Sequence, residues 1–302
     1  MIRKFTSTSR KMSSISSALH NVLDKIESAK EKRKTDNGEF PVTSRLVAVS
    51  KTKPPSSVVE AYRCGQKHFG ENYVNELSEK SIAPEIQSEC KDIKWHFIGH
   101  LQSKKAGALV SCPNLFMVET VHSDKIANAL NRNWELKKKE GKLKVMVQVN
   151  TSNEENKSGC NPDEAVNIVK NIKENCPNLE FTGLMTIGSF DHDLSKGPNP
   201  DFLKLSECRN KVCEELKLHR QEVELSMGMS GDFEHAIELG STNVRVGSTI
   251  FGARDPPNKT SGNSASSSGV KGSSGSTNKE SNVKDKDVLK ASNELNEMSL
   301  AM

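Results

Sequence analysis

Residues 225–232 read LSMGMSGD, and residues 243–252 read NVRVGSTIFG. Each stretch is a short apolar run that breaks into Gly, Ser or Thr, and a helical pattern over 232–239 follows the first stretch. A helix N-terminus and a glycine-containing loop both expose backbone N–H groups, which together can bind a phosphate. In a barrel of parallel strands, such phosphate sites form in the loops after the seventh and eighth strands. The two stretches therefore predict the end of a (β/α)8 barrel.

Strand-like and helix-like segments alternate along the chain. The expected strands cover residues 46–50, 68–70, 94–98, 115–118, 143–149, 180–185, 224–227 and 243–246. The helical patterns between them cover residues 56–64, 73–81, 104–110, 123–139, 162–175, 201–218 and 231–239. Such alternation predicts a parallel sheet. Eight strands over about 210 residues fit a closed (β/α)8 TIM barrel, and an open, doubly wound sheet is the alternative.

One more helix is expected before the first strand, over residues 15–34. Its apolar residues recur at helical spacing: Ile15, Leu19, Val22, Leu23 and Ile26. At the other end of the chain, no outer helix is expected after Phe251, because Pro256 and Pro257 interrupt the chain there. The N-terminal helix is a candidate to fill that gap.

The composition excludes several classes of protein. The net charge is +4, and residues 1–23 alone hold four basic residues and no acid. The body of the chain therefore has no basic excess, so a nucleic-acid partner is not expected. Seven scattered cysteines without a CxxC pair favour a reducing compartment over a disulfide framework. No apolar run is long enough to span a membrane, and we expect a cytoplasmic protein.

Composition also divides the chain into three parts. Residues 1–14 form a basic leader with the character of a mitochondrial transit peptide, although a disordered basic leader has the same composition. A mitochondrial location therefore stays open beside the cytoplasmic one. Residues 15–257 are assigned to the barrel and its N-terminal helix. Residues 258–302 are rich in Ser, Gly and Lys and are expected to be disordered, because they lack the hydrophobicity to fold alone.

A lysine follows the first strand of this predicted barrel. Residues 46–50 form an apolar run, and Lys51 comes directly after it, where barrel active sites form. A desolvated lysine has a lowered pKa, and its neutral amine can form an imine. Together with the distant phosphate site, Lys51 indicates pyridoxal 5′-phosphate (PLP) held as a Schiff base. Lys53, in the loop before Pro54, is the rival for this role.

Three residues of the C-terminal stretches are the candidates for binding the phosphate. Ser230 is expected to cap a helix that begins near Gly231 and to reach the phosphate through its hydroxyl and N–H groups. Gly247 and Ser248 are expected to complete the site at the end of the last strand. An ordinary helix cap and an ordinary turn are the alternatives without a ligand.

Two further polar residues are candidates for contacting the cofactor. Arg245 lies two residues before Gly247, so both point to one face of the last strand. A buried arginine is costly unless it is paired, and an ion pair with a glutamate is the alternative role. Asn72 follows the second strand and could bind the cofactor or cap a helix. No cysteine or acid lies at metal-ligand spacing from the histidines, so no metal site is expected.

Six motifs carry a resemblance to a known family. Four read AVSKTKP (48–54), FGENY (69–73), WHFIGHLQ (95–102) and GLMTIG (183–188), and the other two are the C-terminal stretches. In this order, from about Arg45 to Arg254, the chain resembles the pyridoxal phosphate homeostasis protein family. The resemblance implies a barrel like the N-terminal domain of alanine racemase, a fold-type III PLP protein. It also implies that Lys51 is the cofactor lysine and that Arg245 faces the pyridine nitrogen.

The resemblance implies a role in vitamin B6 homeostasis, in which the protein buffers or delivers PLP. Apo forms of PLP-dependent enzymes are the partners that such delivery implies. The alternative is an enzyme, an amino-acid racemase or decarboxylase. Racemases that resemble this barrel add a C-terminal β-domain with a tyrosine base, whereas this chain is of low complexity after Arg254 and has only Tyr62 and Tyr73. Racemisation needs a second base opposite the lysine, so the sequence favours a carrier without catalytic residues.

Overall fold

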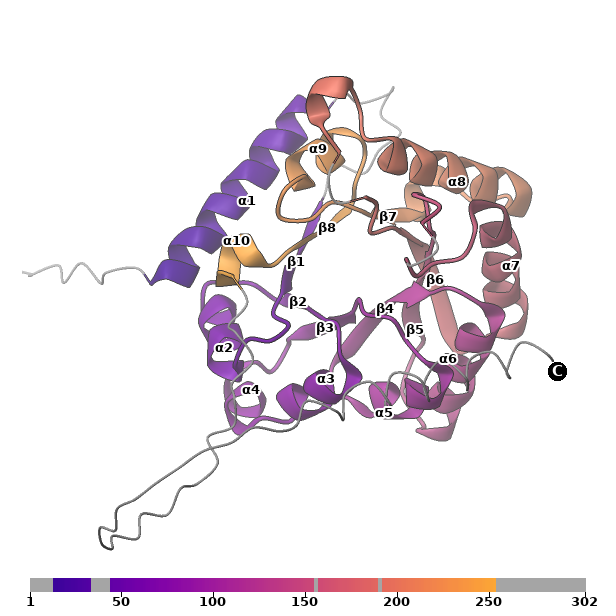
Figure 1. Cartoon of the computed structure of the whole chain (residues 1–302). Helices are drawn as coiled ribbons and strands as arrows, with labels where there is room; N and C mark the ends of the chain where they lie inside the picture. Colours follow the sequence, from indigo (N-terminus) through magenta and orange to yellow (C-terminus); the bar gives the residue numbers. More distant parts are fainter. Residues whose placement is uncertain (1–12, 34–43, 155–156, 190–191, 254–302) are drawn as a thin grey trace, which may run out of the picture. The chain divides into compact units, whose positions relative to one another are not determined.

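Eight parallel strands close into a barrel in the computed structural model of the chain (Figure 1). The structure describes residues 13–33, 44–154, 157–189 and 192–253. The strands are β1 (Arg45–Val49), β2 (His68–Glu71), β3 (Lys94–Phe97), β4 (Leu115–Val121), β5 (Leu143–Gln148), β6 (Leu179–Met185), β7 (Glu224–Ser226) and β8 (Asn243–Val246). Each strand pairs with the next, and β1 pairs with β8 to close the ring. The predicted TIM barrel is confirmed, and the open-sheet alternative is wrong.

Helices surround the ring of strands (Figure 1). They are α2 (Pro55–Arg63), α3 (Val74–Ser81), α4 (Pro84–Glu89), α5 (Ala106–Ser111), α6 (Asp124–Leu136), α7 (Ala165–Asn175), α8 (Pro200–Leu216), α9 (Phe233–Glu238) and α10 (Ser248–Phe251). The predicted helices are present with shifted ends. The sequence reading missed α4 and α10, which have six and four residues and are too short to show a helical period.

The N-terminal helix α1 (Ser14–Lys32) completes the outer layer. It packs against α2, α9 and α10, outside β1 and β8 (Figure 1). Its buried face consists of Leu19, Val22, Ile26 and Ala29, four positions that share one side of a helix. The N-terminal helix therefore fills the place of the missing eighth outer helix, as the sequence indicated.

Much of the core lies between the strands and the surrounding helices. Between the strands and the helices lie large, fully buried side chains that include Phe69, Trp95, Phe97 and Phe202.

All seven cysteines are free thiols. No helix in the described part of the chain is long and apolar enough to cross a membrane. The predictions for the basic leader up to residue 12 and for the tail at 258–302 lie outside the described residues.

Candidate functional site

A cavity of about 580 Å³ opens where the strands end. Its walls come from the segments after β1, β2, β3, β6, β7 and β8, at the end of the barrel where the active sites of this fold form. The structure brings all six predicted site residues to this cavity: Lys51, Asn72, Ser230, Arg245, Gly247 and Ser248.

The pairing of the first and last strands explains why residues so far apart in the chain meet here. In the β1–β8 register, Val47 lies beside Arg245. Two residues further along each strand, a Cβ atom at Gly247 would lie 3.2 Å from the backbone oxygen of Val49, which is closer than most Cβ contacts. The glycine thus lets the end of β8 approach the end of β1, two residues before Lys51.

The loop after β7 differs from the sequence prediction. The helix α9 begins at Phe233 with Asp232 as its N-cap residue, so Ser230 does not cap it, and that part of the prediction is wrong. Asp232 Oδ1 accepts the N–H of Met229 at 2.6 Å and closes the turn before the helix. Ser230 Oγ instead accepts the N–H of Gly247 at 3.2 Å. Ser230 therefore ties the loop after β7 to the loop after β8.

Backbone N–H groups are present at the end of β8. In α10, Ile250 and Phe251 both donate to the carbonyl of Gly247. The N–H groups of Ser248 and Thr249, in the first turn, lie outside the helical hydrogen bonds. Such groups at a helix start suit an anion.

Arg245 forms the inner wall of the cavity and is 4% exposed. Its guanidinium donates to Ser226 Oγ at 2.6 Å and to the carbonyl of Thr186 at 2.8 Å. Burial lowers the pKa of Arg245, while the negative charge of Glu119 opposes that shift. Within the described residues Arg245 makes no direct ion pair, because the Ser226 hydroxyl stands between it and Glu119. The ion-pair alternative is therefore wrong for a direct contact.

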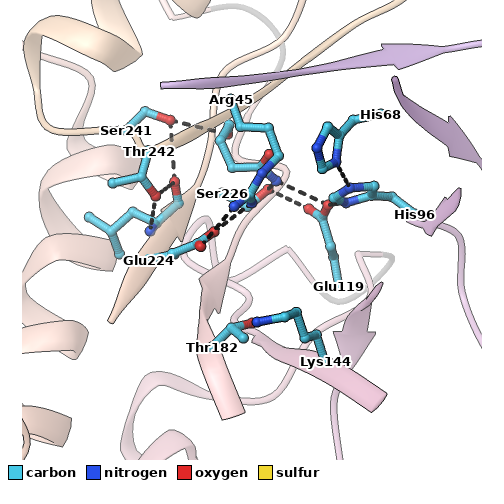
Figure 2. Close-up of polar contacts among 12 residues, drawn as sticks. Arg45, His68, His96, Glu119, Lys144, Thr182, Glu224, Ser226, Ser241 and Thr242 are labelled. Atoms are coloured by element: carbon cyan, nitrogen blue, oxygen red, sulfur yellow. Dashed lines mark hydrogen bonds and ion pairs between the residues drawn. The ribbon is translucent and has the colours of Figure 1, made fainter. Parts of the chain in front are cut away.

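A chain of buried polar side chains continues from Ser226 through the barrel interior (Figure 2). Ser226 Oγ donates to Glu119 Oε2 at 2.5 Å, and His96 Nδ1 lies 2.6 Å from Glu119 Oε1. His96 Nε2 lies 2.8 Å from His68 Nδ1. Burial alone would raise the pKa of Glu119, but the hydrogen bond from His96 and nearby positive charges lower it to about 2. The carboxylate is therefore ionised and accepts only, so His96 Nδ1 carries the proton of that bond.

The sequence reading missed Glu119 and His96 as parts of this network. The available signal was a glutamate inside the apolar run of β4 and a histidine between Trp95 and Phe97 in β3. On strands buried on both faces, a polar residue must find a partner inside the protein. Which partner it finds depends on strands that are distant in the chain.

Asn72 lines the cavity and has a buried side-chain acceptor, Oδ1, without a partner among the described residues. The next helix, α3, has Tyr73 as its N-cap residue, so the helix-cap alternative for Asn72 is wrong. A Cβ atom at Gly99 would lie 1.8 Å from the backbone oxygen of Asn72. Gly99, which the sequence reading did not single out, is therefore required for the position of Asn72.

Lys51 and Lys53 both line the cavity, but they are not equivalent. Lys53 Nζ donates to the carbonyl of Ala253 at 2.7 Å, next to α10. Lys51 is half-buried and follows β1 directly. With Arg245 these lysines give the cavity three cationic side chains, against the single carboxylate of Asp232 among the described lining residues. The site therefore suits an anionic ligand, and an amine is present for chemistry at a carbonyl carbon.

Known proteins with related sequences and structures were compared with this chain. Residues 33–255 match the family described as alanine racemase, N-terminal domain. The human pyridoxal phosphate homeostasis protein is 56% identical over 238 residues, which cover 79% of this chain and 86% of the human protein. The Haemophilus influenzae protein of the same name is 41% identical over 241 residues, covering 78% of this chain and 94% of that protein.

Among solved structures, PipY from Synechococcus elongatus with PLP bound has a TM-score of 0.63 and 28% identity, and the match covers 79% of this chain and 100% of PipY. The human and Haemophilus influenzae relatives share one name, and each match covers more than two thirds of this chain. The chain therefore belongs to the pyridoxal phosphate homeostasis protein family, whose barrel is that of the alanine racemase N-terminal domain.

Proposed function

We propose that this protein binds PLP as a Schiff base on Lys51 and acts in vitamin B6 homeostasis by buffering or delivering the cofactor. The observation that carries the proposal is the closure of β1 against β8, which brings Lys51 and the two glycine-containing loops to one cavity. The names of the relatives and the PLP-bound structure of PipY support it.

The lining residues fit PLP group by group. The Ser230 hydroxyl, which the Gly247 N–H holds in place, and the backbone N–H groups of Ser248 and Thr249 would hold the phosphate. The Asn72 side-chain amide, which has both donor and acceptor groups, would form a hydrogen bond with the ring oxygen. When bound, PLP supplies an aldehyde carbon, with which the Lys51 amine forms a C=N bond and releases one water.

Arg245 would face the pyridine nitrogen of the bound ring. A guanidinium donates but does not accept hydrogen bonds, so it would keep that nitrogen unprotonated and weaken the ring as an electron sink. This arrangement suits storage of the cofactor better than bond cleavage. The buried polar chain behind Arg245 fixes the direction of its guanidinium through Ser226.

The positions of the two tyrosines also support a non-catalytic role. The Tyr62 hydroxyl is directed to Asp92 on the outer surface, and Tyr73 is 56% exposed. Neither is among the described residues that line the cavity, so neither supplies a base opposite Lys51. The proposed recipients of the cofactor are apo forms of PLP-dependent enzymes.

The proposal is tested by the absorbance of the purified protein and by reduction with borohydride. With PLP, the wild-type protein should absorb at about 420 nm, as an imine of PLP does. Lys51→Ala should lose this band and the reducible bond, while the matched variant Lys53→Ala should keep both. A Lys51→Ala protein that still carries a reducible internal imine would contradict the assignment.

A further inference from the structure

A buried lysine outside the cavity has all of its hydrogen-bonding capacity satisfied. Lys80, on α3, is 4% exposed. Its Nζ donates to Glu71 Oε1 at 2.6 Å, to Glu76 Oε1 at 2.9 Å and to the carbonyl of Ser50 at 2.9 Å. An ammonium group has three donors, so this environment matches it fully. Among the described residues that line the cavity, neither Lys80 nor the two glutamates appear.

This ionic cluster holds both chain neighbours of Lys51. On one side, the Ser50 hydroxyl donates to Glu71 Oε1 at 2.7 Å, and the Ser50 carbonyl accepts from Lys80. On the other side, the N–H of Thr52 donates to Glu76 Oε1 at 2.6 Å. The residue between these two anchored positions is Lys51.

The turn that carries Lys51 needs such anchoring. Thr52 has a φ of 63°, in the left-handed region that a β-branched residue rarely adopts. A residue in this conformation persists only when its surroundings hold it there. Here the hydrogen bond from its own N–H to Glu76 supplies that restraint. Without the restraint, the backbone of Thr52 would relax and the direction of the preceding lysine would change.

We propose that Lys80 is a positioning residue for Lys51. Through Glu71 and Glu76 it fixes the turn at residues 50–52 so that the Lys51 amine faces the loops after β7 and β8. The inference rests on the proposed function, because it assigns a purpose to the direction of that amine. A buried ion pair adds little net stability compared with apolar packing, which is consistent with a role in geometry.

The proposal predicts that covalent capture and simple binding respond differently to a change at Lys80. Deoxypyridoxine phosphate has the ring and phosphate of PLP but no aldehyde, so its affinity reports only the non-covalent contacts of the site. The rate at which PLP becomes bonded to Lys51, measured by borohydride trapping and peptide mass analysis, reports the position of the amine. A general loss of structure would weaken both together.

The test compares Lys80→Met with Lys144→Met in the full chain. Lys144 is a matched control, because it also pairs with a glutamate, Glu180, at 2.8 Å, but on the surface. We expect Lys80→Met to slow bond formation by about tenfold to a hundredfold, as a misplaced reacting group does. Its affinity for deoxypyridoxine phosphate should change by less than about twofold, and Lys144→Met should change neither quantity.

A second variant and a second measurement cover the case in which Lys80→Met does not fold. Glu76→Leu removes the acceptor of the Thr52 N–H at the partly exposed end of the cluster and should slow bond formation in the same direction. In the ligand-free protein, hydrogen exchange of the peptide that contains residues 50–53 should be faster in both variants than in the wild type and in Lys144→Met.

The outcomes separate the two proposals. If the wild-type protein forms no bond at Lys51, the proposed function fails, and the exchange measurement still decides whether the cluster holds the turn. If the wild type forms the bond and both variants form it at an unchanged rate, the role of Lys80 is overturned. A parallel loss of bond formation and of deoxypyridoxine phosphate affinity would also overturn it.

Discussion

Ser230 illustrates how one side chain can join two loops that are distant in the chain. Its hydroxyl accepts the N–H of Gly247, and both residues line the cavity. Ser230→Ala should weaken PLP binding by about tenfold, because it removes a hydrogen bond and frees the two loops from each other. Binding of unphosphorylated pyridoxal should weaken much less. Equilibrium titrations with both compounds check this, and equal losses for the two would exclude a phosphate role.

His68 makes the stability of the barrel depend on pH. Burial lowers its pKa from 6.5 to about 3, and the positive charges of Arg45 and Lys94 act in the same direction. Below pH 6.5 the unfolded chain takes up a proton at this position that the folded protein excludes. The free energy of unfolding therefore falls as the pH drops from 6.5 toward 3, while above 6.5 this group has no effect.

His68→Asn should make that fall less steep, because asparagine does not titrate. Its side-chain amide has both a donor and an acceptor, so one of the two can take the place of His68 Nδ1 beside His96. Urea denaturation of both proteins between about pH 7.5 and about pH 5 measures the difference in slope. Other histidines with lowered pKa values, such as His122 and His235, are present in both proteins and cancel in the comparison. Identical slopes would contradict the prediction.

Single residues also show how far the sequence could be read. Lys51, Arg245 and Gly247 could be found because each lies at or just after the end of a recognisable apolar strand. Lys80 and Glu119 could not, because their meaning depends on partners from other elements, such as the carbonyl of Ser50 and the hydroxyl of Ser226. A buried charged residue looks the same in sequence as a solvated one.

Among the elements, α1 is the one that has no counterpart in the repeating strand–helix pattern. It lies across β1 and β8, the strands that close the barrel, and its Leu19 is fully buried. Leu19→Ala should lower the free energy of unfolding by about 2–5 kcal/mol, since it leaves a cavity between helix and barrel. Leu23→Ala, where the side chain is 37% exposed, should cost less than about 1 kcal/mol.

Chemical denaturation of the wild type and the two leucine variants checks this prediction. Equal losses at Leu19 and Leu23 would mean that α1 does not pack as the structure shows.

The strands were predictable because each has its own local run of apolar residues. The helices α4 and α10 were not, because helices of six and four residues have no measurable period. The position of α1 followed from the gap after Phe251 and not from its own sequence.

The molecule as a whole is predicted to carry its cofactor without committed turnover. Among the described residues, Lys51, Lys53 and Arg245 line the cavity, and no tyrosine does. We therefore expect negligible racemisation of L-alanine and L-serine with saturating PLP, and transfer of the bound cofactor to an apo-enzyme. Chiral chromatography after long incubation, with Lys51→Ala as the control, measures the first. Lysine-dependent turnover on the order of one per second or faster would restore the enzyme alternative.

The pairing of β1 with β8 also determines at which point of synthesis the site can form. Lys51 leaves the ribosome early, whereas Ser230, Arg245 and Gly247 follow only after most of the barrel. A nascent chain that has not yet produced β8 contains the lysine but lacks Arg245 and the loop after β8. A ligand stabilises only the state that binds it. We therefore expect PLP to raise the free energy of unfolding of the complete barrel and to leave incomplete chains without this stabilisation.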